Sequence, residues 1–405
     1  MKQMNALCVL PYLFWLAAFV TIPIWISVNA SQWDFNVYSR AMHSLQNGHD
    51  PYLDGIAIQD RLHQDGALPT DSNISFTYVY TPVTLPLLKL LGYLPGWCAG
   101  FYWLLYAAGA LAQYWVCIKT GEGNERIFLA LFAPAAAFFP SLLQTGTILS
   151  GNIAYIVYGA VLLAAYHGWR HNRWTYFYAV VLVASCFKPP YLSLLAIPVL
   201  SARHQWLRAC IVGAMGVAAF AVQPFLWPGT FHNFLRAVAL QFDYNCDFGA
   251  SPAGIFGMSL SRMHIPFNIA SWIFYLLYAV PVFVLLVILS RRYFDGSISR
   301  QQWIPLLLCG VILLNPRLIE YDLAPVTMPL ALILFRHIVA SSHRLWQAAI
   351  TVSLLTAANF ITFSNELESR SAMCFLLTGI FAMGSWRLLY RSREIEALPA
   401  LENAA

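Results

Sequence analysis

Charged residues are scarce in this chain of 405 residues. Asp, Glu, Lys and Arg make up 10% of the sequence, whereas hydrophobic residues make up 59%. Soluble domains contain about 25% charged residues, and the mean hydropathy here is +0.61. So few charges cannot cover the water-facing surface of a protein of this size. The scarcity excludes an ordinary soluble enzyme and predicts an integral membrane protein, with the lipid bilayer as a partner.

Paired cysteines are also missing from the sequence. The eight cysteines are scattered, mostly within apolar runs, and they form neither a Cys-x-x-Cys pair nor a zinc-ligand spacing. We therefore expect them to be packing residues and predict no metal site. The formal charge of +5 does not indicate a nucleic-acid partner. The basic residues fall in short clusters between apolar runs, and membrane topology explains such clusters better.

Apolar runs recur along the whole chain. A hydrocarbon core about 30 Å thick requires roughly 20 apolar residues in a helix. Twelve runs are predicted to cross the membrane, at residues 7–29, 97–119, 126–143, 150–167, 174–187, 189–202, 206–227, 270–290, 302–316, 322–339, 345–363 and 371–391. We therefore expect one all-α, polytopic domain over residues 1–391, followed by a cytoplasmic tail at 392–405.

A cytoplasmic N-terminus gives the most consistent topology. Alternating sides from there leaves most of the 23 Lys and Arg residues inside, as the positive-inside rule requires. The first run is too long for a signal peptide and has no small-residue cleavage site, so we expect a retained helix. The topology also requires a hairpin whose apex, Lys188-Pro189-Pro190, reaches the outer side. Residues 80–94 must then be re-entrant or interfacial.

Two long segments lie on the outer side in this topology, residues 30–79 and 228–268. In the first segment, a helical pattern begins at Asp34 and stops at Gly48. Its apolar face consists of Phe35, Tyr38, Met42 and Leu45. The pattern predicts a short amphipathic helix on the membrane surface. Residues 230–245 show a similar pattern.

Ionisable side chains gather at the predicted outer ends of the helices. Such groups cost several kcal/mol at membrane depth unless they are paired or hydrated, so each is a candidate functional residue. They are Asp34, Lys188, Arg317, Glu320 and Asp322, with Arg40 in the first outer loop. A carboxylate beside cations suits a reaction that needs a base and a stabilised anionic leaving group.

Each candidate also has a structural interpretation. Asp34 could cap the surface helix that it begins, and spacing alone favours this role. Lys188 could simply extend its ammonium to the interface. Arg317 could clamp a phosphate with its bidentate fork, or it could pair with a neighbouring acid. Asn152 could make polar contacts between helices.

The first outer segment resembles the opening of glycosyltransferase family 87. That family has an Asp-Phe-x-Val-Tyr helix start, a Gly-x-x-Pro-Tyr turn and a Tyr-x-Tyr-Pro-Pro segment. The similar stretches here are Trp33-Asp34-Phe35-Asn36-Val37-Tyr38, Asn47-Gly48-His49-Asp50-Pro51-Tyr52 and Phe76-Thr77-Tyr78-Val79-Tyr80-Thr81-Pro82, with Thr81 in place of the first proline.

Later elements of the family pattern follow in the same order. The similar stretches are Gly151-Asn152, Lys188-Pro189 and Asn315-Pro316-Arg317 with Tyr321-Asp322. The resemblance spans residues 30–330. The chain departs from the better-known members near Tyr321 and Asp322, where those members often carry histidine.

The resemblance implies a membrane enzyme of the GT-C class. Such enzymes use a polyprenyl-phosphate-linked sugar, usually mannose, and act on the extracytoplasmic side, here of the plasma (inner) membrane. By that likeness Asp34 is the general base. Our hypothesis is an inverting transfer of a hexose to a lipid or glycan acceptor, with the leaving phosphate bound by Lys188 and Arg317. No metal or cofactor is required, because two cations neutralise that phosphate. The expected substrate-binding residues are Tyr38, Arg40, Tyr52, Tyr80, Asn152, Glu320 and Asp322.

Two other functions remain open at this point. The chain could be a secondary transporter or flippase for a lipid-linked or small substrate. Transporters tend to contain paired repeats and broken helices near the midplane, whereas no repeat is evident here and the ionisable residues gather at one face. The chain could also be a non-catalytic membrane partner in envelope assembly.

Overall fold

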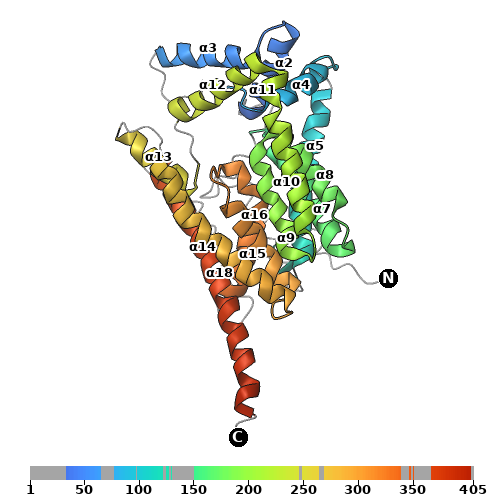
Figure 1. Cartoon of the computed structure of the whole chain (residues 1–405), viewed down its shortest axis with the longest axis vertical. Helices are drawn as coiled ribbons and strands as arrows, with labels where there is room; N and C mark the ends of the chain where they lie inside the picture. The colour runs from blue at the N-terminus through green and yellow to red at the C-terminus, as the bar shows by residue number, and fades with distance from the viewer. Residues whose placement is uncertain are drawn as a thin grey trace.

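A bundle of helices carries a layer of shorter helices across one end (Figure 1). The computed structural model describes residues 33–64, 77–96, 98–121, 125–126, 129, 150–245, 249–263, 269–338, 346–347, 350 and 366–402. Within these residues every regular element is a helix and none is a strand. The predicted all-α class is confirmed.

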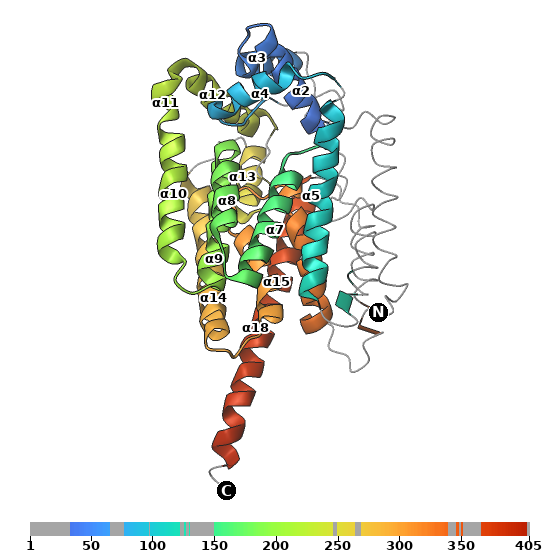
Figure 2. The same cartoon turned by 90° about the vertical axis from the view of Figure 1, so that its right-hand side faces the viewer.

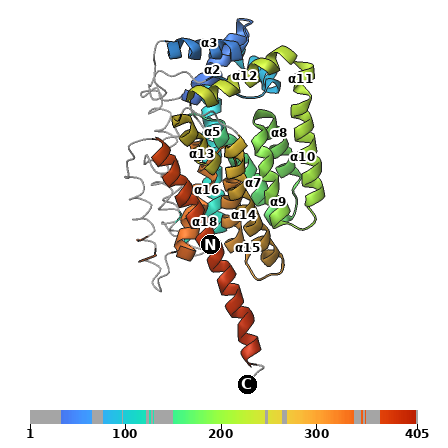
Figure 3. The same ribbon diagram turned by 60° about the vertical axis from the view of Figure 1, so that its left-hand side comes forward.

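The bundle and the layer are built from different parts of the chain (Figure 2). The bundle contains α5 Cys98–Thr120, α7 Ala154–His171, α8 Thr175–Phe187, α9 Ala196–Ser201, α10 Trp206–Ala221, α14 Ile269–Phe294, α15 Arg300–Leu313, α16 Ala324–Ile333 and α18 Glu366–Glu402. The layer contains α2 Trp33–Gln46, α3 Pro51–Gln64, α4 Leu85–Gly92, α11 Gln223–Leu226 and α12 Pro228–Asn245. The remaining helix, α13 Pro252–Arg262, packs against α14 and α18 (Figure 3).

Four segments among the described residues are long and apolar enough to cross a membrane. They are Cys98–Thr120, Trp206–Leu226, Ile269–Phe294 and Arg370–Tyr390. These segments indicate a membrane protein, but the described residues do not show the twelve predicted crossings.

Shorter helices account for part of this difference. Apolar helices of 10–17 residues cover Thr175–Phe187, Pro189–Ser201 and Ala324–His337. Proline ends a helix because it lacks an N–H donor and clashes with the preceding turn, and Pro189 and Pro190 follow α8 directly. The predicted crossings at 7–29, and nearly all of those at 126–143 and 345–363, lie outside the described residues.

The amphipathic outer helices occur where the sequence predicts them. In α2 the buried side chains are Val37, Tyr38, Ala41 and Ser44. The helix ends where His49 N–H donates to the Ser44 carbonyl at 2.9 Å across Gly48, the hydrogen-bond pattern typical of a glycine-terminated helix. The predicted helix at 230–245 corresponds to α12.

The apolar stretch at 80–94 contains a helix that is too short to cross a membrane. It contains a 3₁₀ turn, η1 Pro82–Thr84, and the eight-residue helix α4. Eight residues span only about 12 Å, so α4 cannot cross a bilayer. It packs against α2 and exposes Leu87, Leu90 and Leu91, which favours the interfacial alternative over the re-entrant one.

Two glycines bring α5 and α7 into backbone contact. A Cβ added to Gly159 would lie 2.5 Å from the Cα of Gly109. Small residues permit this close approach between helices in a membrane bundle. Gln113 supports the contact, because its Nε2 donates to the Tyr155 carbonyl at 3.0 Å. The pair fixes the first turns of α7 beside the middle of α5.

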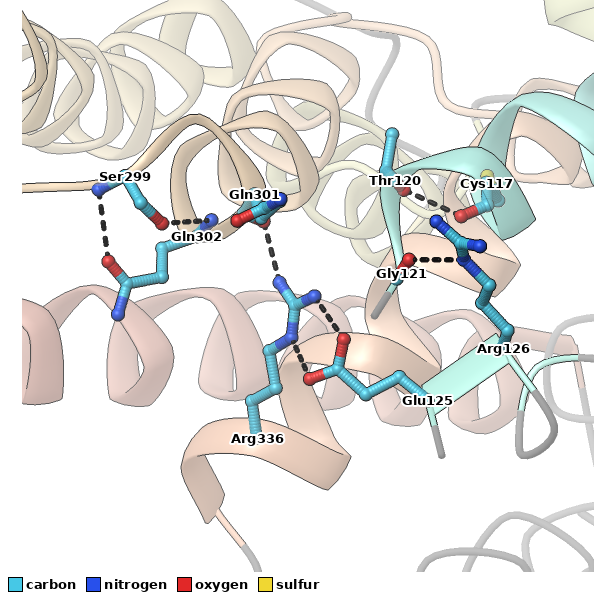
Figure 4. A network of polar contacts seen from close by, with 9 residues as sticks. All are labelled: Cys117, Thr120, Gly121, Glu125, Arg126, Ser299, Gln301, Gln302 and Arg336. Carbon is cyan, nitrogen blue, oxygen red and sulfur yellow. Dashed lines mark hydrogen bonds and ion pairs between the residues drawn. The ribbon is translucent and has the colours of Figure 1, made fainter. Parts of the chain in front are cut away.

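A partly buried ion pair connects two segments that lie far apart in the sequence (Figure 4). Arg336 Nε donates to Glu125 Oε1 at 2.6 Å, and Arg336 Nη1 donates to the Gln301 carbonyl at 2.6 Å. Arg336 Nη2 also contacts the Glu125 carboxylate. The side chains of Arg336 and Glu125 are only 11% and 18% exposed, respectively. Arg336 belongs to a π-helical turn, η5 Leu334–Ile338. The pair therefore joins η5 to the segment that follows α5.

Candidate functional site

Asp34 lies in the first turn of α2, where the outer layer meets the bundle. The main-chain N–H groups of Asp34 and Phe35 donate to the Ser150 carbonyl at 3.0 and 3.2 Å. These are two of the donors that the start of a helix leaves unsatisfied. Ser150 caps them, and α2 begins at Trp33. The capping role that spacing favours for Asp34 is therefore filled by the chain before α7.

The turn Ser150-Gly151-Asn152 is built to make this contact. Ser150 Oγ accepts from Asn152 N–H at 3.1 Å, and Asn152 Oδ1 accepts from Ala154 N–H at 2.9 Å. Gly151 has a φ of +70°, and a Cβ there would lie 2.9 Å from the Cβ of Phe35. Asn152 is thus buried in the turn that holds Asp34. Its side-chain oxygen binds the main chain at the start of α7. The substrate contact that the family resemblance implies for Asn152 stays a prediction.

Tyr80 connects several of the predicted site residues. Its hydroxyl lies 2.6 Å from the Tyr38 hydroxyl, and its carbonyl accepts a hydrogen bond from the Tyr52 hydroxyl at 2.5 Å. Its ring centroid lies 5.1 Å from Lys188 Nζ. Asp34 also acts electrostatically on Tyr80. The structure therefore brings together five residues that the sequence predicts for the site.

The two tyrosine hydroxyls remain protonated near neutral pH. Burial raises the pKa of Tyr80 well above its ordinary value, and the charge of Asp34 adds to that rise. Burial also raises the pKa of Tyr38, with smaller contributions from Tyr80, Tyr102 and Asp34. Both hydroxyls can therefore act as hydrogen-bond donors beside the Asp34 carboxylate.

Lys188 is held between two tyrosine rings at the end of α8. Its backbone is extended, with φ −138° and ψ 109°, and the 3₁₀ helix η3 Pro189–Leu195 follows it. Nζ donates to the Tyr321 hydroxyl at 3.2 Å and lies 4.4 Å from the centroid of that ring. An ammonium over an aromatic face is attracted by the ring quadrupole. With Tyr80 on another side, this arrangement fixes the cation at the site.

Asp322 interacts with both predicted phosphate-binding cations. It is 7% exposed in η4 Glu320–Asp322, where its carboxylate accepts from Tyr158 Oη at 2.9 Å and from Ile319 N–H at 3.4 Å. Burial raises the pKa of Asp322, while Lys188, these two hydrogen bonds and Arg317 act in the opposite direction. Lys188 and Arg317 therefore share one buried carboxylate.

The residues just before α13 fix the segment that carries Arg317. Ala250 N–H donates to the Leu318 carbonyl at 2.6 Å, and Ser251 Oγ contacts the Pro316 carbonyl. Asn315 Oδ1 accepts from the Arg317 N–H at 3.2 Å. Residues from two distant parts of the sequence thus define the position of this cation.

The contacts above define one polar cluster, which consists of Asp34, Tyr38, Tyr80, Lys188, Tyr321 and Asp322. Two predicted site residues are not brought into this cluster by the described contacts. Arg40 is exposed, and its Nε donates to the Asn36 carbonyl one turn earlier at 3.3 Å. The backbone of Glu320 belongs to η4, but its side chain lies outside the described residues.

A groove of ≈ 580 Å³ lies against α2 and includes Tyr38 and Tyr80 in its lining. Tyr38 and Tyr80 line it next to the site, and apolar side chains of α2, α4 and α5 form most of its wall. The exposed leucines Leu87, Leu91 and Leu105 lie on its lining. The groove is therefore suited to an apolar chain whose polar end reaches the cluster.

Sequence reasoning missed two tyrosines of the site, Tyr158 and Tyr191. Both are buried, and their rings pack edge to face with centroids 5.4 Å apart. Each falls within a predicted apolar crossing, where an aromatic residue signals core packing. The only available signal was the position of Tyr191, three residues after Lys188.

No metal-binding cluster is found in the part of the chain that the structure describes, where no three His, Cys, Asp or Glu side chains could hold an ion. Comparison with protein-family models, with curated proteins and with solved structures found no match.

Proposed function

We propose that the protein is an inverting glycosyltransferase of the GT-C class that uses a polyprenyl-phosphate-linked hexose. The observation that carries this proposal is the meeting of Asp34 and Lys188 at Tyr80. A candidate phosphate-binding cation thus lies over the ring of Tyr80, and a candidate base from a distant part of the sequence acts electrostatically on the same residue. The same cluster continues through Tyr321 and Asp322 to Arg317.

In the proposed reaction, Asp34 removes the proton of an acceptor hydroxyl as its oxygen attacks the anomeric carbon. The bond from that carbon to the donor phosphate oxygen breaks, and its electron pair remains on the polyprenyl phosphate. Attack opposite the leaving group inverts the anomeric centre. Lys188 and Arg317 stabilise the charge that accumulates on the phosphate, where electrostatic stabilisation contributes most to the rate.

The groove supports a lipid-linked donor. Its apolar wall suits the isoprenoid tail, and Tyr38 and Tyr80 are shared between the groove and the polar cluster. A donor lying along α2 would present its phosphate to Lys188 and its sugar to Asp34. We further propose that the sugar is mannose, that the acceptor is a lipid or glycan, and that this end of a twelve-crossing bundle faces the extracytoplasmic side of the plasma membrane.

A second candidate is a transporter or flippase for a lipid-linked or small substrate. The observation that favours it is the interrupted helix after α8, where the 3₁₀ segment Pro189–Leu195 leads into the short helix α9. Interrupted helices at a binding site are common in secondary transporters.

The decisive experiment uses membranes that contain the wild-type protein, with Asp34→Asn membranes for comparison. We expect transfer of radiolabelled sugar from a polyprenyl-phosphate donor to an endogenous acceptor by the wild type, and loss of that transfer in the variant. Absence of transfer from several donors, together with accumulation of labelled substrate inside sealed vesicles, would establish the transporter instead.

A further inference from the structure

Tyr191 carries a buried hydroxyl at the centre of the cluster. The side chain is 4% exposed, and its hydroxyl has no hydrogen-bond partner among the described residues. It interacts electrostatically with Asp322 and Tyr321, and it also acts on Tyr80. Leaving a buried hydroxyl without a partner costs free energy, so its retention at this position calls for an explanation.

The local backbone directs Tyr191 toward the same region as Lys188. The Tyr191 N–H donates to the Lys188 carbonyl at 3.1 Å, which closes the first turn of η3. Pro189 and Pro190 occupy the first positions of this helix, and Lys188 precedes it as the N-cap residue. Both side chains then share neighbours, because Lys188 lies against Tyr80 and Tyr321 and Tyr191 interacts electrostatically with the same two residues.

The neighbouring tyrosine hydroxyls already have partners. Tyr158 donates to Asp322 at 2.9 Å, Tyr38 and Tyr80 bond to one another, and Tyr321 accepts from Lys188. Within this cluster, Tyr191 therefore has a donor that no described protein group uses. A donor that shares its neighbours Tyr80 and Tyr321 with the Lys188 ammonium is suited to an anionic oxygen, because hydrogen bonds to charged acceptors are the stronger ones.

We propose that the Tyr191 hydroxyl donates a hydrogen bond to a phosphate oxygen of the ligand that Lys188 binds. The inference rests on the proposed function for the identity of that ligand, a lipid phosphate. It adds to the site a neutral donor that recognises the phosphate without a further charge in the buried cluster.

The test measures binding and stability of the purified protein in detergent, with Tyr191→Phe as the variant. We expect its affinity for a polyprenyl monophosphate to fall about 10- to 100-fold, as loss of a hydrogen bond to a charged group predicts. Affinity for the matching uncharged polyprenol should not change. The melting temperature without ligand should stay the same or rise, because the substitution removes a buried hydroxyl that has no partner.

Tyr178→Phe is the matched control. Tyr178 is also a buried tyrosine, but its hydroxyl donates to the Gln205 carbonyl at 3.2 Å, about 15 Å along α8 from Lys188. We expect this variant to melt at a lower temperature and to bind the phosphate probe as the wild type does.

The outcomes separate this inference from the proposed function. If the wild type transfers sugar but Tyr191→Phe binds the phosphate probe normally, the inference is wrong and the function stands. If the wild type transfers no sugar but phosphate binding still depends on Tyr191, the inference stands and the function is wrong. A wild type that binds the uncharged and phosphorylated probes equally would overturn the inference.

Discussion

Replacement of Asp34 by Asn isolates the chemical role of the carboxylate from its structural role. The two side chains have the same shape, and the amides of the first turn of α2 are capped by the Ser150 carbonyl in either case. Loss of a carboxylate from a helix first turn costs only about 0.3–1 kcal/mol. We therefore expect the folded structure to persist in Asp34→Asn.

The catalytic effect should be much larger. General base catalysis contributes about 10²- to 10⁴-fold to a rate, which corresponds to roughly 2.7–5.4 kcal/mol at 1.36 kcal/mol per factor of ten. The loss should appear in kcat, with little change in the KM for the donor, because Asn still fills the site but cannot accept the proton. The assay is initial-rate transfer of labelled sugar at varied donor concentration, together with the melting temperature.

Asp54→Asn provides the matched control. Asp54 lies in the first turn of the neighbouring helix α3, where its carboxylate is 3.6 Å from His49 Nδ1 and is 40% exposed. This change also removes one negative charge from the first turn of a helix, but away from Tyr80, so transfer should be unaffected. The reasoning is refuted if Asp34→Asn keeps a kcat within tenfold of the wild type, or if both variants lose activity equally.

Three further predictions concern the groove, the buried ion pair and the titration of a buried acid. Leu91→Trp should narrow the groove and raise the KM for a long-chain donor more than the KM for a short-chain donor. Leu207 is exposed on α10 and lies outside the groove lining. Leu207→Trp should therefore leave both KM values unchanged in the same kinetic assay. Glu125→Gln should destabilise the protein by about 3–5 kcal/mol because it leaves the Arg336 charge uncompensated; adding Arg336→Gln should recover part of this loss in thermal unfolding, and strictly additive effects would contradict the pairing. Because burial raises the pKa of Asp322, the unfolded chain loses this proton first as the pH rises. Stability should therefore decline as the pH increases from about 4 toward the folded-state pKa, and a melting profile of Asp322→Asn that keeps the same slope would show that another group is responsible.

The local features of the site could be predicted from the sequence. Spacing of apolar residues located α2, and the residue types marked Asp34 and Lys188 as unusual at a membrane surface. The prolines after Lys188 indicated a break in the helix. Each of these signals depends only on neighbouring residues, so a single sequence contains it.

Contacts between distant segments could not be predicted in this way. Nothing in the sequence shows that Ser150 caps α2, or that Tyr321 lies against the Lys188 ammonium. Arg40 was selected because it is a cation in an outer loop, yet it bonds within its own helix. Among the described residues, fewer helices are long enough to cross a membrane than the sequence predicts, because apolar composition does not reveal where proline-rich segments replace long helices with shorter ones.

The contacts of Tyr80 have a consequence for how this protein can evolve. One residue meets partners from three segments through different atoms: its hydroxyl contacts Tyr38, its main-chain carbonyl contacts Tyr52 and its ring contacts Lys188. A substitution at any one partner therefore changes which residues can be accepted at the other two positions. Substitutions at these positions should therefore show strong epistasis, and relatives that replace Tyr80 should carry compensating replacements at the partner positions.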